Sequence, residues 1–179
     1  MKIVVIGVSA GGPETLKRLF QEVKILKVPV IIAQHNAAED VESFAKSFSA
    51  QIKWDVQVVK DKDLVTPSTI YMPAGGKDIT LTGKDVIAVQ NPVDIVAPSI
   101  DRLFKSAAKH FRSEAVAIIL SGLGRDGVEG AMGISKAGGR VIVQQDAKFS
   151  HLPEVVAENV FNALKRSLID IAMFLENLE

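Results

Sequence analysis

The sequence predicts a three-layer α/β protein in which a doubly wound, mostly parallel sheet carries an attached β-hairpin. Continuous apolar runs of strand length alternate with segments of helical periodicity along most of the 179 residues. The runs do not alternate polar and apolar residues, which is typical of parallel strands covered on both faces. Between residues 60 and 91 this rhythm gives way to short β-type segments separated by glycine and proline, which indicates a hairpin at the edge of the main sheet.

Each element follows from its local pattern. The first strand is an apolar run that ends at Gly7, and Pro13 suits the first turn of the helix after it. Ser167 and Asp170 have the spacing of a capping box, which predicts a last helix to residue 178. No repeat or linker interrupts the chain, so we expect one domain over residues 1–179. Strands are expected at 2–6, 28–33, 54–59, 115–120 and 141–145, hairpin segments at 68–72, 78–81 and 86–89, and further helices at 41–48, 99–111, 127–137 and 153–159. The helix that Pro13 opens has its apolar face at positions 16, 19, 20 and 23.

Composition excludes several classes of function. Lys and Arg together number 21 and Asp and Glu also 21, so no global basic field favours nucleic acid or an anionic membrane. No cysteine is present, which excludes disulfides, thiolate metal sites and thiol nucleophiles. No apolar run approaches the roughly 18 residues of a membrane span, and the N-terminus does not read as a signal peptide. We therefore expect a cytoplasmic protein that is not inserted in a membrane and binds no nucleic acid.

The first candidate site is the turn after the first strand. Residues 7–11 read G-x-S-x-G between a buried strand and a helix, where a nucleophile elbow belongs, and this would expose the Ser9 hydroxyl. The backbone N–H groups of Gly11 and Gly12 would lie near a helix N-terminus, which favours developing negative charge. The same turn also fits a phosphate cradle or a purely structural glycine turn. The pattern alone leaves all three open.

A serine nucleophile needs a base, and the chain has three histidines. His35 directly follows the second buried strand, so it should emerge beside Ser9 if the two strands are parallel neighbours. His110 lies in the last turn of a helix, where capping of the carbonyl end is the simpler interpretation. His151 precedes Pro153 on a loop and is expected at the surface or at a pocket rim. His35 is the candidate base.

The second candidate site has two interpretations. Gly122, Gly124 and Gly127 form G-x-G-x-x-G between a strand and a helix, and Asp146 lies 19 residues beyond Gly127, where a dinucleotide site places its ribose-binding acid. Alternatively, Asp126 is the acid that orients a histidine, or it only caps the next helix. The spacing does not choose between them.

Taken together, these segments resemble the catalytic domain of the chemotaxis protein-glutamate methylesterases, the CheB family. The G-x-S-x-G-G-P turn combined with the S-G-L-G-R-D-G loop is the most specific part, and the matches follow the family's order over most of the chain. The matching stretches are residues 6–13, 33–35, 70–81, 98–111, 115–139 and 144–146.

The resemblance implies a serine hydrolase with Ser9 as nucleophile, His35 as general base and Asp126 as orienting acid. It also implies that the Leu123 amide is an oxyanion donor. The family reaction hydrolyses glutamyl methyl esters on the cytoplasmic helices of chemoreceptors, with glutamine deamidation in some members, and requires no metal or other cofactor. The family's receiver domain has no counterpart in this sequence, so we expect no phosphorylation control within it, and a separate regulatory protein is one possible partner.

The departures from the family pattern cluster around the expected substrate rim. Ala10 replaces a hydroxyl residue after the nucleophile, and Asn36 begins a segment that lacks the family's Met-Pro-Pro. Ala97 stands where an arginine is usual, and the shortened loop with His151 replaces a Phe-Gly-Met-Pro segment. We expect Ala10, Asn36 and His151 at this rim. The alternative to an active enzyme is a non-catalytic or repurposed homologue that acts on another ester or only binds a partner.

Overall fold

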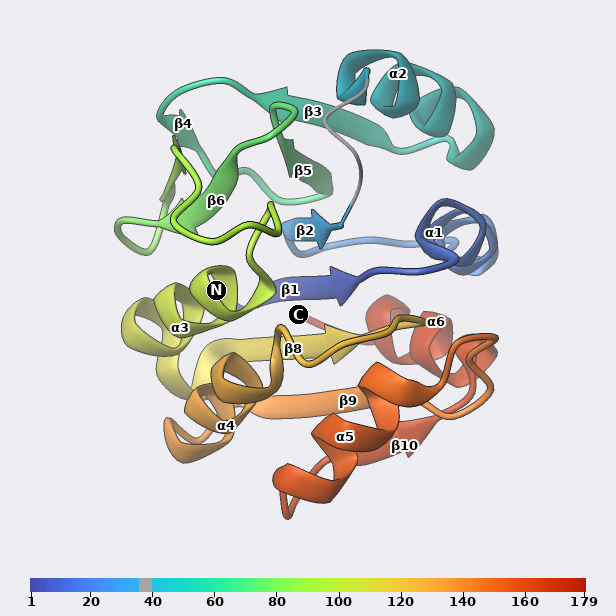
Figure 1. Ribbon diagram of the computed structural model, residues 1–179. Helices are drawn as coiled ribbons and strands as arrows, with labels where there is room; N and C mark the ends of the chain where they lie inside the picture. The colour runs from blue at the N-terminus through green and yellow to red at the C-terminus, as the bar shows by residue number, and fades with distance from the viewer. Residues whose placement is uncertain (36–39) are drawn as a thin grey trace.

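The computed structural model describes residues 1–35 and 40–179 and has three layers (Figure 1). A seven-stranded, fully parallel sheet forms the middle layer, as the apolar runs predict. Its strands lie in the order β10 (Leu164–Arg166), β9 (Arg140–Gln144), β8 (Ala115–Ile119), β1 (Ile3–Val8), β2 (Val30–Gln34), β5 (Thr69–Pro73) and β3 (Asp55–Val59).

Helices cover both faces of this sheet. Alternate residues of β1 enter two separate cores: Val4 and Ile6 pack on one side, and Ile3 and Val5 on the other, all fully buried. The first core is completed by α1 (Gly12–Glu22), α2 (Val41–Ile52) and α6 (Leu168–Glu176). The second core is completed by α3 (Ile100–Phe111), α4 (Val128–Lys136), α5 (His151–Asn159) and a small second sheet.

The predicted hairpin is present, but it belongs to this second, antiparallel sheet of three strands. β6 (Asp78–Leu81) and β7 (Val86–Gln90) form the hairpin, and the two-residue β4 (Asp63–Leu64) pairs with β7. The sheet packs against α3, where the Leu81 amide donates a hydrogen bond of 2.9 Å to the Ser106 hydroxyl.

One segment expected in the hairpin lies elsewhere. Residues 68–72 were expected beside the hairpin strands, whereas β5 joins the main sheet between β2 and β3. All five residues of β5 are buried, with Ile70 in one core and Tyr71 in the other. The short apolar run between Pro67 and Pro73 is a two-sided core strand, and a hairpin strand would leave one face wet.

Smaller differences lie at the ends of elements. Two short elements were not expected from the sequence. The strand β10 has no apolar run because its three residues are all exposed. The short 3-10 helix η1 (Arg112–Glu114) directly follows α3. The last helix begins as expected, with the Ser167 hydroxyl accepting a hydrogen bond of 3.2 Å from the Asp170 amide. No helix in the described residues is long and apolar enough to cross a membrane.

Candidate active site

Ser9 lies in the turn between β1 and α1, and both neighbours of β1 help to fix it. β8 and β2 flank β1 in parallel register. The Ser9 amide donates to the Ser121 carbonyl at 3.0 Å, just beyond β8. Gly11 then turns the chain into the helix with φ at +73°, a left-handed conformation that favours glycine. The half-buried hydroxyl therefore lies at the carboxyl edge of the sheet, where α/β proteins place their sites.

His35 follows β2 directly and faces Ser9. Its amide donates to the Val8 carbonyl at 2.9 Å, which extends the β1–β2 pairing by one residue and fixes the side chain beside the serine. The Nδ1 atom lies 3.2 Å from the Ser9 hydroxyl, and Nε2 lies 2.7 Å from Oδ2 of Asp126. With the Nε2 proton donated to a carboxylate, the neutral ring offers the lone pair of Nδ1 to the serine.

Asp126 lies on the loop between β8 and α4 and is held at the N-terminus of α3. Its carboxylate accepts hydrogen bonds from the amides of Ile100 at 2.7 Å and Asp101 at 2.8 Å, and a longer one of 3.4 Å from the Ser99 hydroxyl. Burial raises the pKa of Asp126, but the hydrogen bond from His35 and the two amides outweigh it and hold the pKa below its ordinary value. An ionised Asp126 fixes the ring of His35 and stabilises its protonated form.

A second carboxylate, Asp101, lies beside this site without facing Ser9. Burial raises the pKa of Asp101 and the nearby charge of Asp126 raises it further, although the Gly130 amide donates to it at 2.7 Å and opposes the shift. Asp101 thus connects the first turn of α3 to α4 and lies next to the acid that holds His35.

Several backbone amides near Ser9 are candidates to stabilise an oxyanion. Within the described residues, the Leu123 and Gly11 amides donate to no protein acceptor, so both could bind a negatively charged oxygen. The Gly12 amide, also expected in this role, donates to the Ser9 carbonyl at 2.9 Å and closes the helix turn. Gly12 therefore does not serve as a free donor, because a helix N-terminal turn after Gly11 consumes its N–H.

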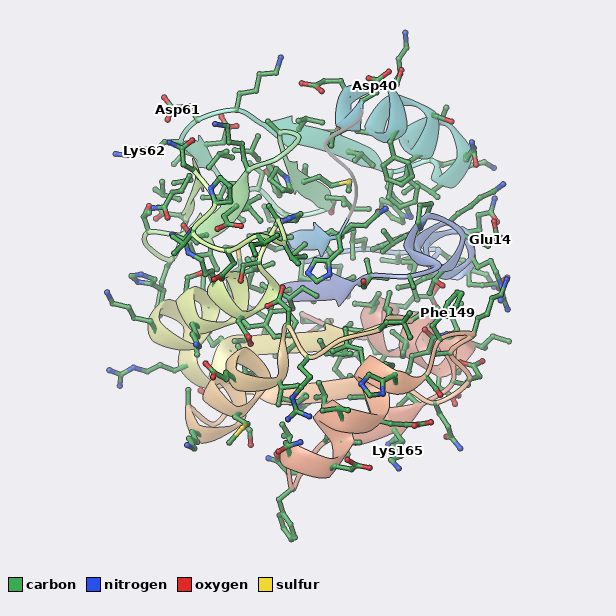
Figure 2. All side chains as sticks on the ribbon, viewed as in Figure 1. Glu14, Asp40, Asp61, Lys62, Phe149 and Lys165 are labelled. Atoms are coloured by element: carbon green, nitrogen blue, oxygen red, sulfur yellow. The ribbon has the colours of Figure 1, made fainter. Side chains whose placement is uncertain are left out.

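Gly122 permits the close approach of the loop after β8 to Ser9. A Cβ atom on Gly122 would lie 2.9 Å from Cβ of Ser9 and 3.3 Å from its amide nitrogen. The Gly122 amide donates to the Phe149 carbonyl at 2.8 Å. Phe149, labelled in Figure 2, lies on the loop after β9, and its ring would lie 3.2 Å from a Cβ atom on Gly11. Glycine at positions 11 and 122 thus allows the loop after β8 and the loop after β9 to lie close to the turn that carries Ser9.

An open cleft of about 610 Å³ lies in front of the three side chains. One wall is the segment 91–98, here called the strap, which contributes Ile95, Val96 and Ala97. The opposite wall is the loop with Leu123, Gly124 and Arg125. Ile95 is fully exposed and Val96 and Leu123 about half exposed, so the cleft has an apolar rim beside a polar centre.

The residues expected at the substrate rim are Ala10, Asn36 and His151, and the structure describes two of them. Ala10 is half-buried, and its carbonyl accepts a hydrogen bond of 2.8 Å from the Ser121 hydroxyl. His151 is the exposed first residue of α5 and does not line the cleft. Asn36 lies outside the described residues. Ser9, His35 and Asp126 thus come together from three different loops, whereas neither Ala10 nor His151 lines the cleft.

The dinucleotide interpretation of the second motif does not match the structure. Asp146, the expected ribose-binding acid, accepts the Leu168 amide at 3.0 Å and caps the N-terminus of α6. Gly122 packs against Ser9, since a Cβ atom on it would lie 2.9 Å from Cβ of Ser9. The glycine at position 122 therefore allows the loop after β8 to lie close to the turn after β1.

Sequence reasoning missed the residues that support Asp126 and the cleft wall. The α3 start with Ser99, Ile100 and Asp101 has an N-cap signal, since Ser99 accepts the Arg102 amide at 3.2 Å, but no pattern shows that its amides face Asp126. Ser121 is fully buried, and its hydroxyl bonds both Ala10 and the Phe149 amide. A single serine at the end of an apolar run does not indicate that its hydroxyl connects two loops.

The fold and this arrangement define a class: an α/β protein with a Ser–His–Asp constellation at the carboxyl edge of a parallel sheet. A family model described as CheB methylesterase matches residues 4–175. The chain therefore belongs to the CheB methylesterase family, as the sequence motifs predict.

Similar proteins extend this finding. The crystal structure of the Thermotoga maritima CheB methylesterase catalytic domain superposes with a TM-score of 0.91 at 27% identity, covering 99% of this chain and 98% of that one. A protein-glutamate methylesterase/protein-glutamine glutaminase of the group 3 operon of Rhizobium meliloti is 32% identical over 98% of this chain and 49% of its own length. A relative with the same enzyme name from Trichodesmium erythraeum is 34% identical over 82% of this chain and 44% of its own length. The chain thus spans about half the length of these curated relatives.

Proposed function

We propose that this chain is a serine hydrolase that demethylates glutamyl methyl esters on the cytoplasmic region of chemoreceptors. The observation that carries the proposal is the contact series from Ser9 through His35 to Asp126, with distances of 3.2 and 2.7 Å. A nucleophile, a base and an orienting acid are the groups that acyl transfer requires. The enzyme names of the relatives supply the substrate class.

The chemistry follows from the geometry. The Ser9 oxygen attacks the ester carbonyl while Nδ1 of His35 takes its proton, and the carbonyl oxygen becomes an oxyanion facing the Leu123 and Gly11 amides. The C–O bond to methoxide then breaks, and His35 returns the proton so that methanol leaves. Water, deprotonated by His35, attacks the glutamyl-Ser9 ester and releases glutamate and free Ser9. Glutamine would follow the same path with ammonia as the leaving group.

The cleft fits a polypeptide substrate. Its open, apolar rim lies at the surface of the molecule, so an esterified side chain can reach Ser9 while its own backbone remains outside. Arg125 adds one cationic group to the wall opposite the strap. The proposed partner is therefore a protein segment, and the reaction needs no metal or other cofactor.

The decisive experiment measures methanol release from methylated receptor cytoplasmic fragments with the wild type and Ser9→Ala. We expect release by the wild type and none above background with Ser9→Ala, because His35 then has no nucleophile to activate. A fluorophosphonate should label the wild type and not Ser9→Ala. Labelling without methanol release would show a hydrolase with another substrate. Receptor binding without labelling at any pH between about 6 and 9 would show a non-catalytic homologue.

The matched control is Ser113→Ala. Ser113 lies in the turn η1, before β8 and so at the opposite end of the sheet from Ser9. This variant removes a serine hydroxyl without touching the cleft, and we expect wild-type labelling and release. A loss equal to that of Ser9→Ala would contradict the assignment of Ser9.

A further inference from the structure

Asp78 is a fully buried carboxylate outside the cleft that no step of the proposed reaction uses. It begins β6, has no exposed surface, and divides its two oxygens between two partners. Oδ1 accepts the Ser99 amide at 2.7 Å, and Oδ2 pairs with the guanidinium of Arg102. A buried charge is costly unless it is paired and fully hydrogen-bonded, so the position of both partners is coupled to this carboxylate.

The first oxygen fixes the start of α3. Ser99 is the N-cap residue, and the next two amides, of Ile100 and Asp101, are the donors that hold Asp126. A displacement of Ser99 would move both donors, and with them the acid that orients His35. Asp78 thus acts on Asp126 indirectly, by holding Ser99, the residue that directly precedes the two donors to Asp126.

The second oxygen fixes the base of the strap. Arg102 also donates to the Gln90 side chain at 2.6 Å and to the Asn91 carbonyl at 3.3 Å, where β7 ends and the strap begins. The strap then extends to Pro98 and contributes Ile95 and Val96 to the cleft wall. Since Ile95 is fully exposed, little packing of its own holds that part of the strap, and its anchors determine where the wall lies.

We propose that Asp78 is a positioning residue for the proposed esterase: through Ser99 it aligns the acid of the triad, and through Arg102 it places the substrate-binding wall. The proposal rests on the proposed function for its kinetic consequences but not for its structural ones. The two arms separate experimentally because each uses a different oxygen. Asp78→Asn retains an acceptor for Ser99 and loses the ion pair, whereas Asp78→Ala loses both contacts.

The kinetic test uses a peptide that carries a glutamyl methyl ester, together with fluorophosphonate labelling as a measure of Ser9 reactivity alone. For Arg102→Gln and Asp78→Asn we expect KM to rise about 3- to 10-fold, with kcat and the labelling rate within about twofold of wild type. For Asp78→Ala we expect the labelling rate to fall at least 10-fold as well. The double variant with Asp78→Asn and Arg102→Gln removes both charges of the pair and should raise KM no further than the worse single variant.

The structural test is hydrogen exchange of backbone amides, which does not depend on activity. Faster exchange at residues 88–90, where β7 ends beside Arg102, is expected in Arg102→Gln and Asp78→Asn, and faster exchange at 99–101 in addition only in Asp78→Ala. Lys105→Gln is the control, since Lys105 lies on α3 and pairs with exposed Glu129 away from the cleft. Should Asp78→Ala fail to fold, the neutral double variant and the two single variants still test the strap arm.

The outcomes separate this proposal from the proposed function. A wild type without methanol release or labelling contradicts the esterase, while the exchange pattern still tests Asp78. Unchanged exchange and unchanged KM in both Arg102→Gln and Asp78→Asn would overturn the strap arm. Wild-type labelling by a folded Asp78→Ala would overturn the triad arm. A fall in apparent kcat with unchanged KM, in proportion to the folded protein lost in every variant, would indicate a purely structural role.

Discussion

Asp126 acts at the scale of single atoms, because its Oδ2 atom contacts Nε2 of His35 while the amides of Ile100 and Asp101 hold the carboxylate in place. Asp126→Asn keeps the shape of the side chain but removes the charge that stabilises protonated His35 and allows the wrong ring orientation. We expect the fluorophosphonate labelling rate to fall by roughly 10³- to 10⁴-fold, the scale seen for such a change in a well-studied protease triad. Labelling kinetics on protein with a wild-type circular dichroism spectrum would measure this.

A matched control for Asp126 is Asp146→Asn. Asp146 also accepts a helix-terminal amide, that of Leu168, but caps α6 outside the cleft. Asp146→Asn keeps the acceptor oxygen and removes only a negative charge near the helix N-terminus, so we expect a stability loss of about 0.3–1 kcal/mol and an unchanged labelling rate. An equal fall in labelling in both variants would show that the effect of Asp126 is on folding.

Asp101 gives a prediction about pH at the same scale. Because burial raises the pKa of Asp101 and the charge of Asp126 adds to it, the folded protein binds this proton more tightly than the unfolded chain does. The contribution of Asp101 to stability is therefore present below its unfolded pKa and is lost as pH rises through its folded pKa. Asp101→Asn keeps an acceptor for Gly130 and should stabilise the protein at pH 7 by on the order of 0.5 kcal/mol, since half-exposed charges are screened. Urea unfolding at pH 7 and at pH 3.5 measures it: a gain that does not shrink at the lower pH would contradict the assignment.

At the scale of elements, the site depends on how closely the loop after β8 approaches the turn after β1. Gly122→Ala places a methyl group 2.9 Å from Cβ of Ser9, so the nucleophile or the loop must shift. We expect a cost of roughly 1–3 kcal/mol from overpacking and at least a 10-fold fall in the labelling rate. Thermal melting and labelling on the same preparation separate the two effects.

Gly138→Ala provides the comparison for Gly122. Gly138 lies just after α4 and has φ at +84°. A Cβ atom on Gly138 would lie 3.6 Å from Cβ of Ser113, an ordinary contact distance. Its substitution should cost about 1–2 kcal/mol through the left-handed backbone and leave labelling unchanged. If Gly122→Ala lost only stability, in the manner of Gly138→Ala, the close approach would have no role in placing Ser9.

The same elements show how far sequence reasoning extends. Ser9 and His35 were predictable as neighbours, because each directly follows a buried apolar run and parallel strands end at one edge. Asp126 was ambiguous, since a glycine-rich loop between strand and helix serves a dinucleotide or a catalytic loop equally well, and only the family resemblance chose between them. Asp78 had no local signal at all. Its partners Ser99 and Arg102 lie 21 and 24 residues away, and tertiary contacts of this kind leave no periodicity in the sequence.

At the scale of the whole molecule, the site lies over the centre of the sheet, and the edge strands and the second sheet lie around it. β2, β1 and β8 are adjacent central strands, and the loops after them supply His35, Ser9 and Asp126 in turn. The edge strands β3 and β10 contribute no group to this constellation. The second sheet lies on the α3 side, where it carries Asp78 and connects to the strap. The central strands therefore position Ser9, His35 and Asp126, and the second sheet lies beside them next to α3.

This arrangement predicts that stability and reactivity depend on different parts of the molecule. Ile118 lies in the middle of β8, fully buried and in register with Ile6, but it touches none of the three reacting side chains. Ile118→Ala should lower the free energy of unfolding by about 2–5 kcal/mol through lost burial and the cavity left behind. Leu164→Ala, at the exposed edge strand β10, should lower it by less than about 1 kcal/mol.

Urea unfolding measures both free energies, and fluorophosphonate labelling at low temperature measures Ser9 in the molecules that remain folded. We expect labelling per folded molecule within about twofold of wild type in both variants, because the hydrogen bonds that place Ser9 and His35 come from the backbone of β1, β2 and the loop after β8. These bonds persist as long as the strands stay paired, whatever apolar side chain fills position 118. A labelling rate that fell in proportion to stability in Ile118→Ala would show instead that side-chain packing beneath the sheet, and not strand pairing, sets the geometry of the site.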